Sequence, residues 1–366
     1  MHNQFNSNRR TEERQRNVFV SVILILLSVM TVITLVVVNL PATPAGSTLP
    51  PLYEGSEADG TGGEETRKPS SGNYPSVGNF EKFGTPASCK VTLSNSVKPL
   101  SGISSQNAIV VDMSTNIVTH AKGADEKIQI ASMTKVMTLI TAIDLIESNS
   151  DFYERVTIKE AYIDKLKPGG YQIHFYYKDY YDAGNTYDVY VIDLLYGLML
   201  QSSCDAALAL ADHLCGSEDA FVAKMNEKAK ELGIDATTKF SNCYGGDDGG
   251  ENYSTARAVA VMFNYALSNE LAKKIITTKS GEYTYQVTYN YNYPMSMVLD
   301  GMKGKDTGDV TVLGGKSGND DQAGYCLVSF GKTADGHNYL VVTAGDKTNK
   351  SSYVDSAFIY KTFVGK

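Results

Sequence analysis

Strand-like sequence occurs in two places that are far apart in this chain, and the stretch between them is mostly helical. Residues 108–112 and 116–120 are short apolar runs around a turn, a pattern typical of a β-hairpin. Residues 324–330 and 338–344 predict a second pair of antiparallel strands. A sheet must bury its apolar face against other elements. We therefore expect an α+β fold: one antiparallel sheet built from the two ends of the domain, covered by helices, with an inserted all-helical lobe.

Helix patterns fill most of the intervening sequence and also close the domain. The predicted helices cover residues 131–146, 191–200, 205–214, 220–232, 254–267 and 351–364. Two tyrosine-rich stretches interrupt them. Residues 171–190 predict a half-exposed hairpin or loop, and the alternation of tyrosines over 283–293 predicts a strand or hairpin.

The N-terminal sequence predicts a membrane anchor. Residues 18–38 form an apolar run without a charged residue, long enough to span a bilayer. Arg9, Arg10, Arg14 and Arg16 precede this run, and no lysine or arginine follows it before Arg67. That asymmetry places the N-terminus in the cytoplasm and the rest of the protein outside the cell membrane. Cleavage near Ala42 or Ala45 is the alternative to a retained anchor.

Composition changes sharply after the apolar run and divides the chain into four parts. Residues 1–17 predict a cytoplasmic tail and residues 18–38 the anchor. Residues 39–86 are rich in Pro, Gly, Ser, Thr and Glu, which predicts a flexible linker. Residues 87–366 then form the folded domain.

Charge and cysteine content exclude several classes of partner. The net charge is −8, so no basic surface for nucleic acid is expected. The five cysteines are irregularly spaced and match neither a disulfide framework nor a zinc pattern. We expect no metal and no cofactor.

Ser132 and Lys135 stand at the start of the apolar helix 131–146. Residues three apart on a helix share one face, so the two side chains can touch. Burial disfavours a charged amine, and a neutral Lys135 could take the proton of Ser132 and make it a nucleophile. On its own, Ser-x-x-Lys is a common pattern, and a helix-start serine beside a lysine with an exposed amine is the favoured explanation of the motif alone.

Two further patterns strengthen this interpretation because they follow in order. Ser202 lies in a break between two predicted helices, in the sequence Ser-Ser-Cys, where its hydroxyl could pass a proton to a leaving amine. Lys316, Ser317 and Gly318 lie just before the strand at 324–330. An edge-strand lysine and hydroxyl could hold a carboxylate, and the glycines allow a substrate backbone to approach.

These three patterns resemble the motifs of the serine D-alanyl-D-alanine carboxypeptidases, the low-molecular-mass penicillin-binding proteins, which are Ser-x-x-Lys, Ser-x-Asn and Lys-Thr-Gly. The resemblance extends over residues 108–364. It includes residues 193–200 before the second motif, 205–207 after it, 221–226, 253–256 and 322–328. It implies the penicillin-binding protein and β-lactamase-like transpeptidase fold. It also implies that the enzyme trims peptidoglycan stem peptides through an acyl-enzyme and binds β-lactam antibiotics.

The resemblance assigns a role to each motif residue. Ser132 would be acylated by the D-alanyl-D-alanine end of the stem peptide, Lys135 would be the base, and Ser202 would relay the proton to the departing D-alanine. The substrate-binding residues would be Lys316, Ser317, Gly318, Asn319 and Cys204. Of these, Lys316 and Ser317 would bind the terminal carboxylate, and the N–H groups of Ser132 and Asn319 would form the oxyanion hole.

Cys204 is the main departure from the family pattern. The family usually has asparagine there, and a thiol is a weak donor and acceptor, so slower acylation is expected. The alternatives are a non-catalytic wall-binding or β-lactam-sensing relative and a β-lactamase. No Glu-x-x-Leu-Asn deacylation element is evident between Ser202 and Lys316, which argues against the β-lactamase.

Overall fold

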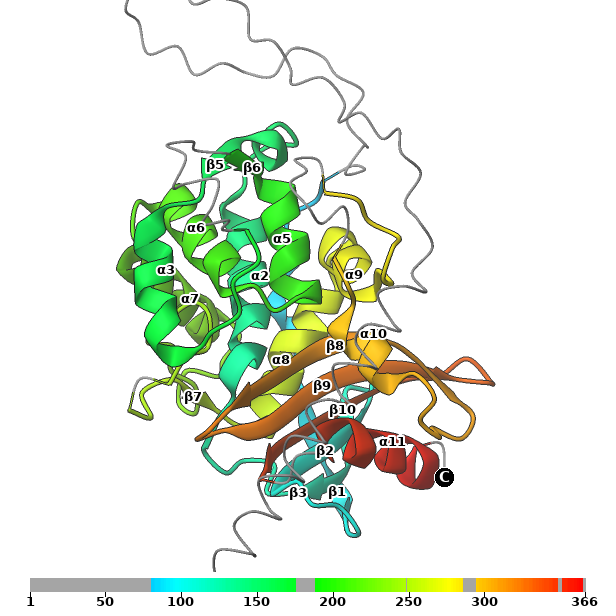
Figure 1. Ribbon diagram of the computed structural model, residues 1–366. Helices are drawn as coiled ribbons and strands as arrows, with labels where there is room; N and C mark the ends of the chain where they lie inside the picture. Colours follow the sequence, from blue (N-terminus) through cyan, green and yellow to red (C-terminus); the bar gives the residue numbers. More distant parts are fainter. Residues whose placement is uncertain (1–79, 176–187, 248, 286–293, 348–350, 365–366) are drawn as a thin grey trace, which may run out of the picture. The chain divides into compact units, whose positions relative to one another are not determined.

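One six-stranded sheet joins the two ends of the domain, in the order β1-β3-β2-β10-β9-β8 (Figure 1). The structure, a computed structural model, describes residues 80–175, 188–247, 249–285, 294–347 and 351–364, all within one unit of the chain, Arg67–Lys366. The strands are β1 (Thr92–Pro99), β2 (Asn107–Asp112), β3 (Ile117–Lys122), β8 (Val310–Asp320), β9 (Gly324–Thr333) and β10 (Asn338–Asp346). Since β2 pairs antiparallel with β10, the predicted sheet from both ends of the domain is confirmed.

Strand β1 is a correction to the predicted sheet. It pairs parallel with β3, so the sheet is mixed and not purely antiparallel. The sequence 92–99 did not predict a strand because its side chains are mostly exposed at the sheet edge and show no apolar alternation. Buried Val91 and Leu100 flank it at its two ends.

Both faces of the sheet are covered, and β2 shows how. Ile109 and Val111 belong to the large core shared with the helical lobe, whereas Ala108 and Val110 belong to a smaller core on the opposite face. Helices α10 (Met297–Met302) and α11 (Ser351–Phe363) cover that opposite face, where α11 is drawn in red (Figure 1). Strands buried on two faces are continuously apolar, which is the pattern of residues 108–111.

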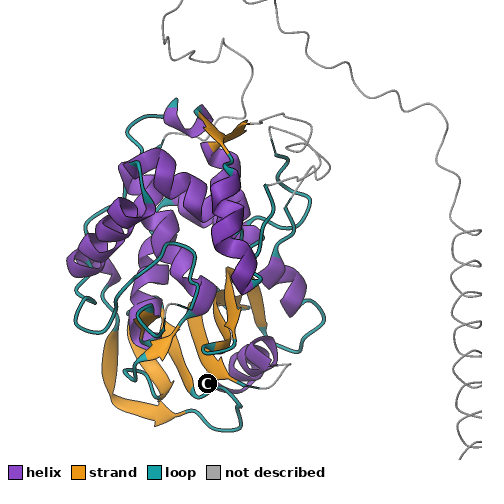
Figure 2. Ribbon diagram, turned by 60° about the vertical axis from the view of Figure 1, so that its left-hand side comes forward, coloured by secondary structure: helices purple, strands orange, loops and turns teal. Residues whose placement is uncertain are grey.

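The helical lobe gathers on one side of the sheet (Figure 2). Its central helix is α2 (Lys135–Leu145), whose residues from 135 to 143 are all buried. Around it lie α3 (Glu160–Leu166), α5 (Val191–Leu200), α6 (Cys204–Cys215), α7 (Glu218–Glu231), α8 (Ala256–Leu267) and α9 (Glu270–Thr277). The inserted lobe and the predicted helices are therefore confirmed, with shifts of a few residues at their ends.

Short elements complete the described structure. Two small sheets pair β4 (Ile128–Gln129) with β7 (Tyr253–Ser254), and β5 (Arg155–Thr157) with β6 (Asp188–Tyr190). Single 3-10 turns occur at η1 (Pro86–Cys89), η2 (Ala131–Thr134), η3 (Asp151–Tyr153) and η4 (Lys167–Gly169).

Tyr283 and Tyr285 do not lie in a strand, contrary to the prediction for 283–293. Instead they pack on the lobe: the Tyr283 hydroxyl donates to Asp193 Oδ1 at 2.5 Å, and its ring stacks on Tyr196. A part-buried hydrogen bond to a carboxylate outweighs the alternating pattern here. Residues 176–187 and 286–293, which hold most of the tyrosines in the two stretches, lie outside the described residues.

The predicted tail and anchor, residues 1–38, also lie outside the described residues, as does most of the predicted linker. Phe80 and Phe83, at the end of that linker, contact the rings of Phe152 and Tyr265 in the folded domain. No helix within the described ranges has the length and apolar character needed to cross a bilayer.

Candidate active site

Ser132 lies in the 3-10 turn η2, immediately before α2. The sequence predicted one continuous helix from 131 to 146, but the backbone begins with this tighter turn, and Ala131 has a φ of 43°. A non-glycine residue in the left-handed region costs on the order of 1–3 kcal/mol and persists only where neighbours hold it. The turn therefore places Ser132 just before the N-terminal end of α2. Contacts with the surrounding structure must offset the backbone strain at Ala131.

Lys135 is completely buried and its amine has three partners. Nζ lies 2.8 Å from Ser132 Oγ, 3.2 Å from Cys204 Sγ and 2.6 Å from the carbonyl oxygen of Tyr244. An ammonium uses all three acceptors. A neutral amine keeps two N–H donors, for Cys204 and Tyr244, and its lone pair is then free to accept the Ser132 proton. The same geometry thus suits both states of a general base.

Ser202 lies in the turn between α5 and α6, with a φ of 59° that places it in the left-handed region. Its neighbours fix the turn on both sides. Gln201 Oε1 accepts from the Tyr285 hydroxyl at 2.5 Å, and the Asp205 carboxylate accepts from the Ser203 hydroxyl and from the backbone N–H of Phe175. The Ser202 hydroxyl is thereby held in a buried, defined position.

Lys316 connects the second and third motifs. Its Nζ lies 2.9 Å from Ser202 Oγ and 2.8 Å from the carbonyl oxygen of Ser317. Burial and the nearby charge of Lys135 hold the pKa of Lys316 well below the ordinary lysine value. A neutral Lys316 beside a hydroxyl can exchange a proton with it, so the pair Lys316–Ser202 is suited to proton relay.

The edge strand β8 runs directly beside the nucleophile. A Cβ added to Gly318 would lie 3.1 Å from Ser132 N and 2.8 Å from the carbonyl oxygen of Ile130, so the glycine permits this approach. Asn319 follows on the strand and is exposed. The Ser317 hydroxyl interacts with the hydroxyl of Tyr353 from α11, which also donates to the carbonyl oxygen of Met297.

Cys204 occupies the position where the family usually has asparagine, and its thiol is fully used. Sγ accepts from Lys135 and donates to the carbonyl oxygen of Ser202 at 3.7 Å. The thiol thus gives the Lys135 amine a partner, although a weaker one than the amide oxygen of an asparagine would be. All five cysteines are free thiols.

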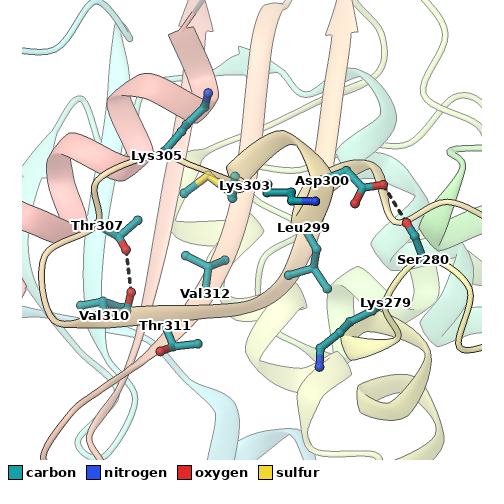
Figure 3. A pocket seen from close by; sticks show the side chains of 11 residues that line it. Lys279, Ser280, Leu299, Asp300, Lys303, Lys305, Thr307, Val310, Thr311 and Val312 are labelled. Atoms are coloured by element: carbon teal, nitrogen blue, oxygen red, sulfur yellow. Dashed lines mark hydrogen bonds between the residues drawn. The ribbon is translucent and has the colours of Figure 1, made fainter.

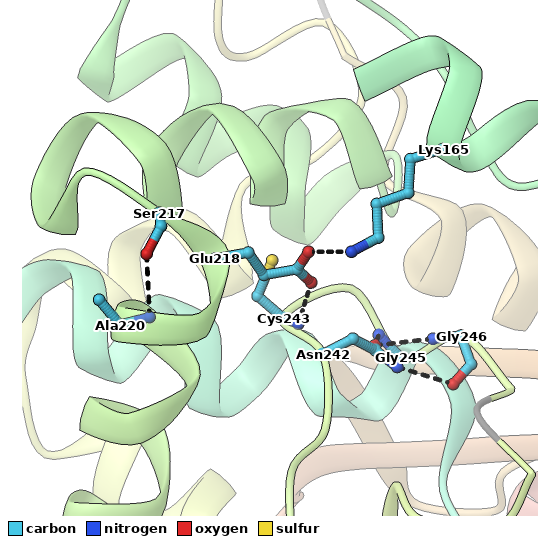
Figure 4. A network of polar contacts seen from close by, with 8 residues as sticks. All are labelled: Lys165, Ser217, Glu218, Ala220, Asn242, Cys243, Gly245 and Gly246. Carbon is cyan, nitrogen blue, oxygen red and sulfur yellow. Dashed lines mark hydrogen bonds and ion pairs between the residues drawn. The ribbon is translucent and has the colours of Figure 1, made fainter. Parts of the chain in front are cut away.

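The loop Asn242–Gly246 supplies the Tyr244 carbonyl and lies against the nucleophile turn. The Asn242 side chain accepts from the N–H groups of Gly245 and Gly246 and donates to the Gly246 carbonyl (Figure 4). A Cβ on Gly245 would lie 2.1 Å from the carbonyl oxygen of Ala131, and its φ is +81°, so this position requires glycine.

Glu218, at the start of α7, fastens this loop from the other side. Its carboxylate accepts from the Cys243 N–H at 3.1 Å and forms an ion pair with Lys165 (Figure 4). The Thr138 hydroxyl, one turn after Lys135 on α2, donates to the Cys243 carbonyl. The carbonyl that contacts Lys135 is therefore held by contacts from two helices.

The structure brings together five of the predicted site residues, Ser132, Lys135, Ser202, Cys204 and Lys316, and places Gly318 beside Ser132. Ser317 contacts Tyr353, and Asn319 is exposed.

Sequence reasoning missed several residues around this centre. Tyr244, Asn242 and Glu218 were not identified. The acidic Asp247 and Glu251 are exposed, but 242–246 are buried. The one sequence signal for this loop was the pair Gly245-Gly246 shortly after Asn242. Within the described ranges, no cluster of three or more His, Cys, Asp and Glu side chains could hold a metal ion.

Comparison with known proteins identifies the family of this chain. Residues 93–348 match the model of the peptidase family described as D-alanyl-D-alanine carboxypeptidase. A D-alanyl-D-alanine carboxypeptidase from Streptomyces sp. (strain K15) is 34% identical over 236 residues, covering 62% of this chain and 75% of that protein. A second carboxypeptidase, from Bacillus subtilis (strain 168), is 30% identical, and the match covers 54% of its length.

Solved structures share the fold. Penicillin-binding protein 5 from Haemophilus influenzae superposes with a TM-score of 0.59 at 26% identity, covering 71% of this chain and 70% of the other. A variant of the Streptomyces K15 DD-transpeptidase, with a cysteine replaced by asparagine, gives a TM-score of 0.57 at 25% identity, covering 72% and 99%. Another variant of that enzyme replaces a serine, two positions before the cysteine, by alanine.

The described domain has the α+β fold of the penicillin-binding proteins, and the matched family covers most of it. The chain belongs to the D-alanyl-D-alanine carboxypeptidase family and is a serine-type hydrolase.

Proposed function

We propose that this protein is a membrane-anchored serine D-alanyl-D-alanine carboxypeptidase that removes the terminal D-alanine from peptidoglycan stem peptides. The observation that carries the proposal is the contact between Lys135 Nζ and Ser132 Oγ at 2.8 Å, with the pair Lys316–Ser202 beside it. Two buried lysines next to two hydroxyls provide a nucleophile, its base and a separate route for the second proton.

Acylation uses these groups in turn. Ser132 Oγ attacks the carbonyl carbon between the two D-alanines as its proton moves to Lys135. The C–O bond of an ester forms, the C–N bond breaks, and the leaving amine takes a proton through Ser202. The N–H groups of Ser132 and Asn319 stabilise the oxyanion, and Ser317 binds the terminal carboxylate.

Deacylation needs a second nucleophile at the same carbon. Water gives the shortened stem peptide, and an amine would give a new amide. The structures of the Streptomyces enzyme carry the name DD-transpeptidase, so transfer to an amine is a second outcome for this chain. A β-lactam would acylate Ser132 in the same manner.

The Streptomyces enzyme also supports a catalytic role for Cys204. Its variants alter a serine and a cysteine two positions apart, the spacing of Ser202 and Cys204 here. A thiol at this position is thus compatible with the family, and we assign it to contact Lys135. This argues for an active enzyme over a non-catalytic relative.

Residues 18–38 would anchor the enzyme in the cell membrane, with the N-terminus in the cytoplasm and the catalytic domain outside. The uncharged run and the arginines before it support this topology. Protease digestion of intact cells should remove the domain after Leu40 and leave a short membrane-bound fragment. A protein recovered whole in the soluble fraction would contradict the anchor.

Covalent labelling tests the function. The purified full chain should react with a fluorescent penicillin and release D-alanine from a pentapeptide ending in D-alanyl-D-alanine. Ser132→Ala should abolish both, whereas Ser96→Ala, an exposed serine on β1, should leave both unchanged. Folded protein that neither labels nor releases D-alanine would favour the wall-binding or sensing relative, and rapid nitrocefin turnover would favour a β-lactamase.

A further inference from the structure

Tyr353, in the first turn of α11, lies against the third motif, although no step proposed above uses it. Its side chain is half-buried. Its hydroxyl contacts the hydroxyl of Ser317 and the carbonyl oxygen of Met297 in α10, the latter at 3.3 Å. The closing helix of the domain therefore contacts the residue to which the proposed function assigns the terminal carboxylate.

The ring of Tyr353 packs against α10 at Gly301. A Cβ added to this glycine would lie 2.5 Å from a carbon of the ring, so a larger residue here would displace the tyrosine. Helix α10 is held in turn by Ser280, beside a cavity of about 360 Å³ (Figure 3). The Ser280 hydroxyl donates to Asp300 at 2.7 Å and accepts from the backbone N–H of Ser296 at 2.7 Å. The place of the Tyr353 hydroxyl is thus set by the packing of two helices.

The protons available at this contact are limited. Ser317 and Tyr353 each have one hydroxyl proton, whereas the Met297 carbonyl only accepts. Since Tyr353 donates to Met297, Ser317 donates to Tyr353, and both protons are then used. The bond to Met297 is a weak one, because 3.3 Å is longer than the usual range for an O–H···O hydrogen bond.

A carboxylate reverses the direction of these hydrogen bonds. It only accepts, so a carboxylate at Ser317 must receive the serine proton. Tyr353 then turns its own proton from Met297 to Ser317 Oγ and gives up only the long bond. We infer that Tyr353 is a positioning residue for substrates with a free carboxyl end: its hydroxyl donates to Ser317 Oγ and directs the serine proton to the terminal carboxylate. The inference rests on the proposed function and adds a source of substrate selectivity to it.

Selectivity arises because the carboxylate is charged. Linked hydrogen bonds polarise one another, so a serine that accepts from Tyr353 is a stronger donor. Hydrogen bonds to a charged acceptor are about twice as strong as those between neutral groups. The contribution of Tyr353 should therefore be larger for a substrate that ends in a carboxylate than for one that ends in an amide.

The test compares two substrates of the full chain. One is a pentapeptide that ends in D-alanyl-D-alanine, the other is the same peptide with a C-terminal amide, and kcat/KM for release of the last residue is measured for each. The wild type should favour the free acid. Tyr353→Phe keeps the ring and should lower the acid-to-amide ratio about three- to tenfold, the effect of losing one neutral hydrogen bond. The loss should lie in KM for the acid more than in kcat, because the carboxylate does not react.

Tyr360 provides the matched control. It lies on the same helix, and its hydroxyl also contacts a serine, Ser329, at 3.1 Å. Tyr360→Phe should keep the wild-type ratio, and urea unfolding shows whether both variants fold. An equal loss for acid and amide in Tyr353→Phe, an unchanged or raised ratio, or the same change in Tyr360→Phe would overturn the inference.

The route through Ser317 is tested by a double variant. Ser317→Ala should itself lower the acid-to-amide ratio, and Tyr353→Phe should lower it no further in that background. A further loss there would overturn the positioning role, because the phenol would then bind the carboxylate itself. A wild type that releases the last residue from both substrates without favouring the acid keeps the proposed function and refutes the inference. A wild type that cleaves neither substrate refutes both.

Discussion

Lys316 Nζ lies 2.9 Å from Ser202 Oγ, and both groups are buried between the helical lobe and the edge strand of the sheet. The lysine of the third motif therefore contacts the hydroxyl of the second motif directly. Burial and the charge of Lys135 lower the pKa of Lys316, so its amine can be neutral at a pH at which an exposed lysine is charged. A neutral amine at this contact can exchange a proton with the Ser202 hydroxyl.

The lowered pKa of Lys316 predicts a pH-dependent stability. Between the folded pKa and the ordinary value of 10.5, the unfolded chain binds one more proton than the folded chain, so stability rises with pH. The cost of burying the charged form is complete below this window. Relative to wild type, the stability gained by Lys316→Met should thus be largest below this window and should shrink as the pH rises toward 10.5. Urea unfolding at several pH values measures the difference, and a constant difference would refute the explanation.

Replacing Cys204 should show how far Lys135 depends on the thiol. Cys204→Ala removes one acceptor of Lys135, and penicillin labelling should slow about tenfold, less than the roughly 100- to 10,000-fold that a general base contributes, because Lys135 itself remains. Cys204→Asn provides an amide oxygen for Lys135 and should label at least as fast as wild type. Cys215→Ala, at the half-buried end of α6, is the control and should have no effect. Normal labelling by Cys204→Ala would show that Lys135 does not need the thiol.

Glu218 should affect catalysis although it does not touch Ser132 or Lys135. Glu218→Ala leaves the buried N–H of Cys243 without its acceptor, which costs about 1–3 kcal/mol, and frees the loop that carries the Tyr244 carbonyl. Slower labelling and a lower free energy of unfolding are expected. Glu218→Gln keeps an acceptor and should lie nearer to wild type. Glu227→Ala, from an exposed pair with Lys224, serves as the control. Equal effects of Glu218→Ala and Glu227→Ala would contradict this role.

Gly245→Ala should disrupt the nucleophile turn. The added Cβ would lie 2.1 Å from the carbonyl oxygen of Ala131, so the loop or the turn must move. We expect a loss of about 2 kcal/mol or more in stability and at least tenfold slower labelling. Gly249→Ala also has a positive φ but no atom within 4 Å of its added Cβ, and should cost only about 1–2 kcal/mol. If the two variants label alike, the steric argument fails.

The order of strand and helix patterns determined the fold class, because periodicity reports local structure and burial. The runs at 108–112 and 338–344 are apolar enough to require cover on both faces, and they pair as β2 and β10. Ser132, Lys135, Ser202 and Lys316 were also predicted as site residues from the sequence, since their residue types and order point to this chemistry, and the structure brings them into contact. Strand β1 was not predicted from the sequence, because an exposed edge strand needs no apolar pattern.

Only the tertiary structure decided which neighbours control these groups. The Tyr244 carbonyl contacts Lys135 across more than a hundred residues of sequence, and any residue type could have supplied a carbonyl there. Lys316 reaches Ser202 because β8 lies against the turn between α5 and α6. Backbone acceptors and long-range approaches leave no pattern in a sequence, since they depend on how separate elements pack. Motif residues, in contrast, must have particular side chains wherever the fold places them.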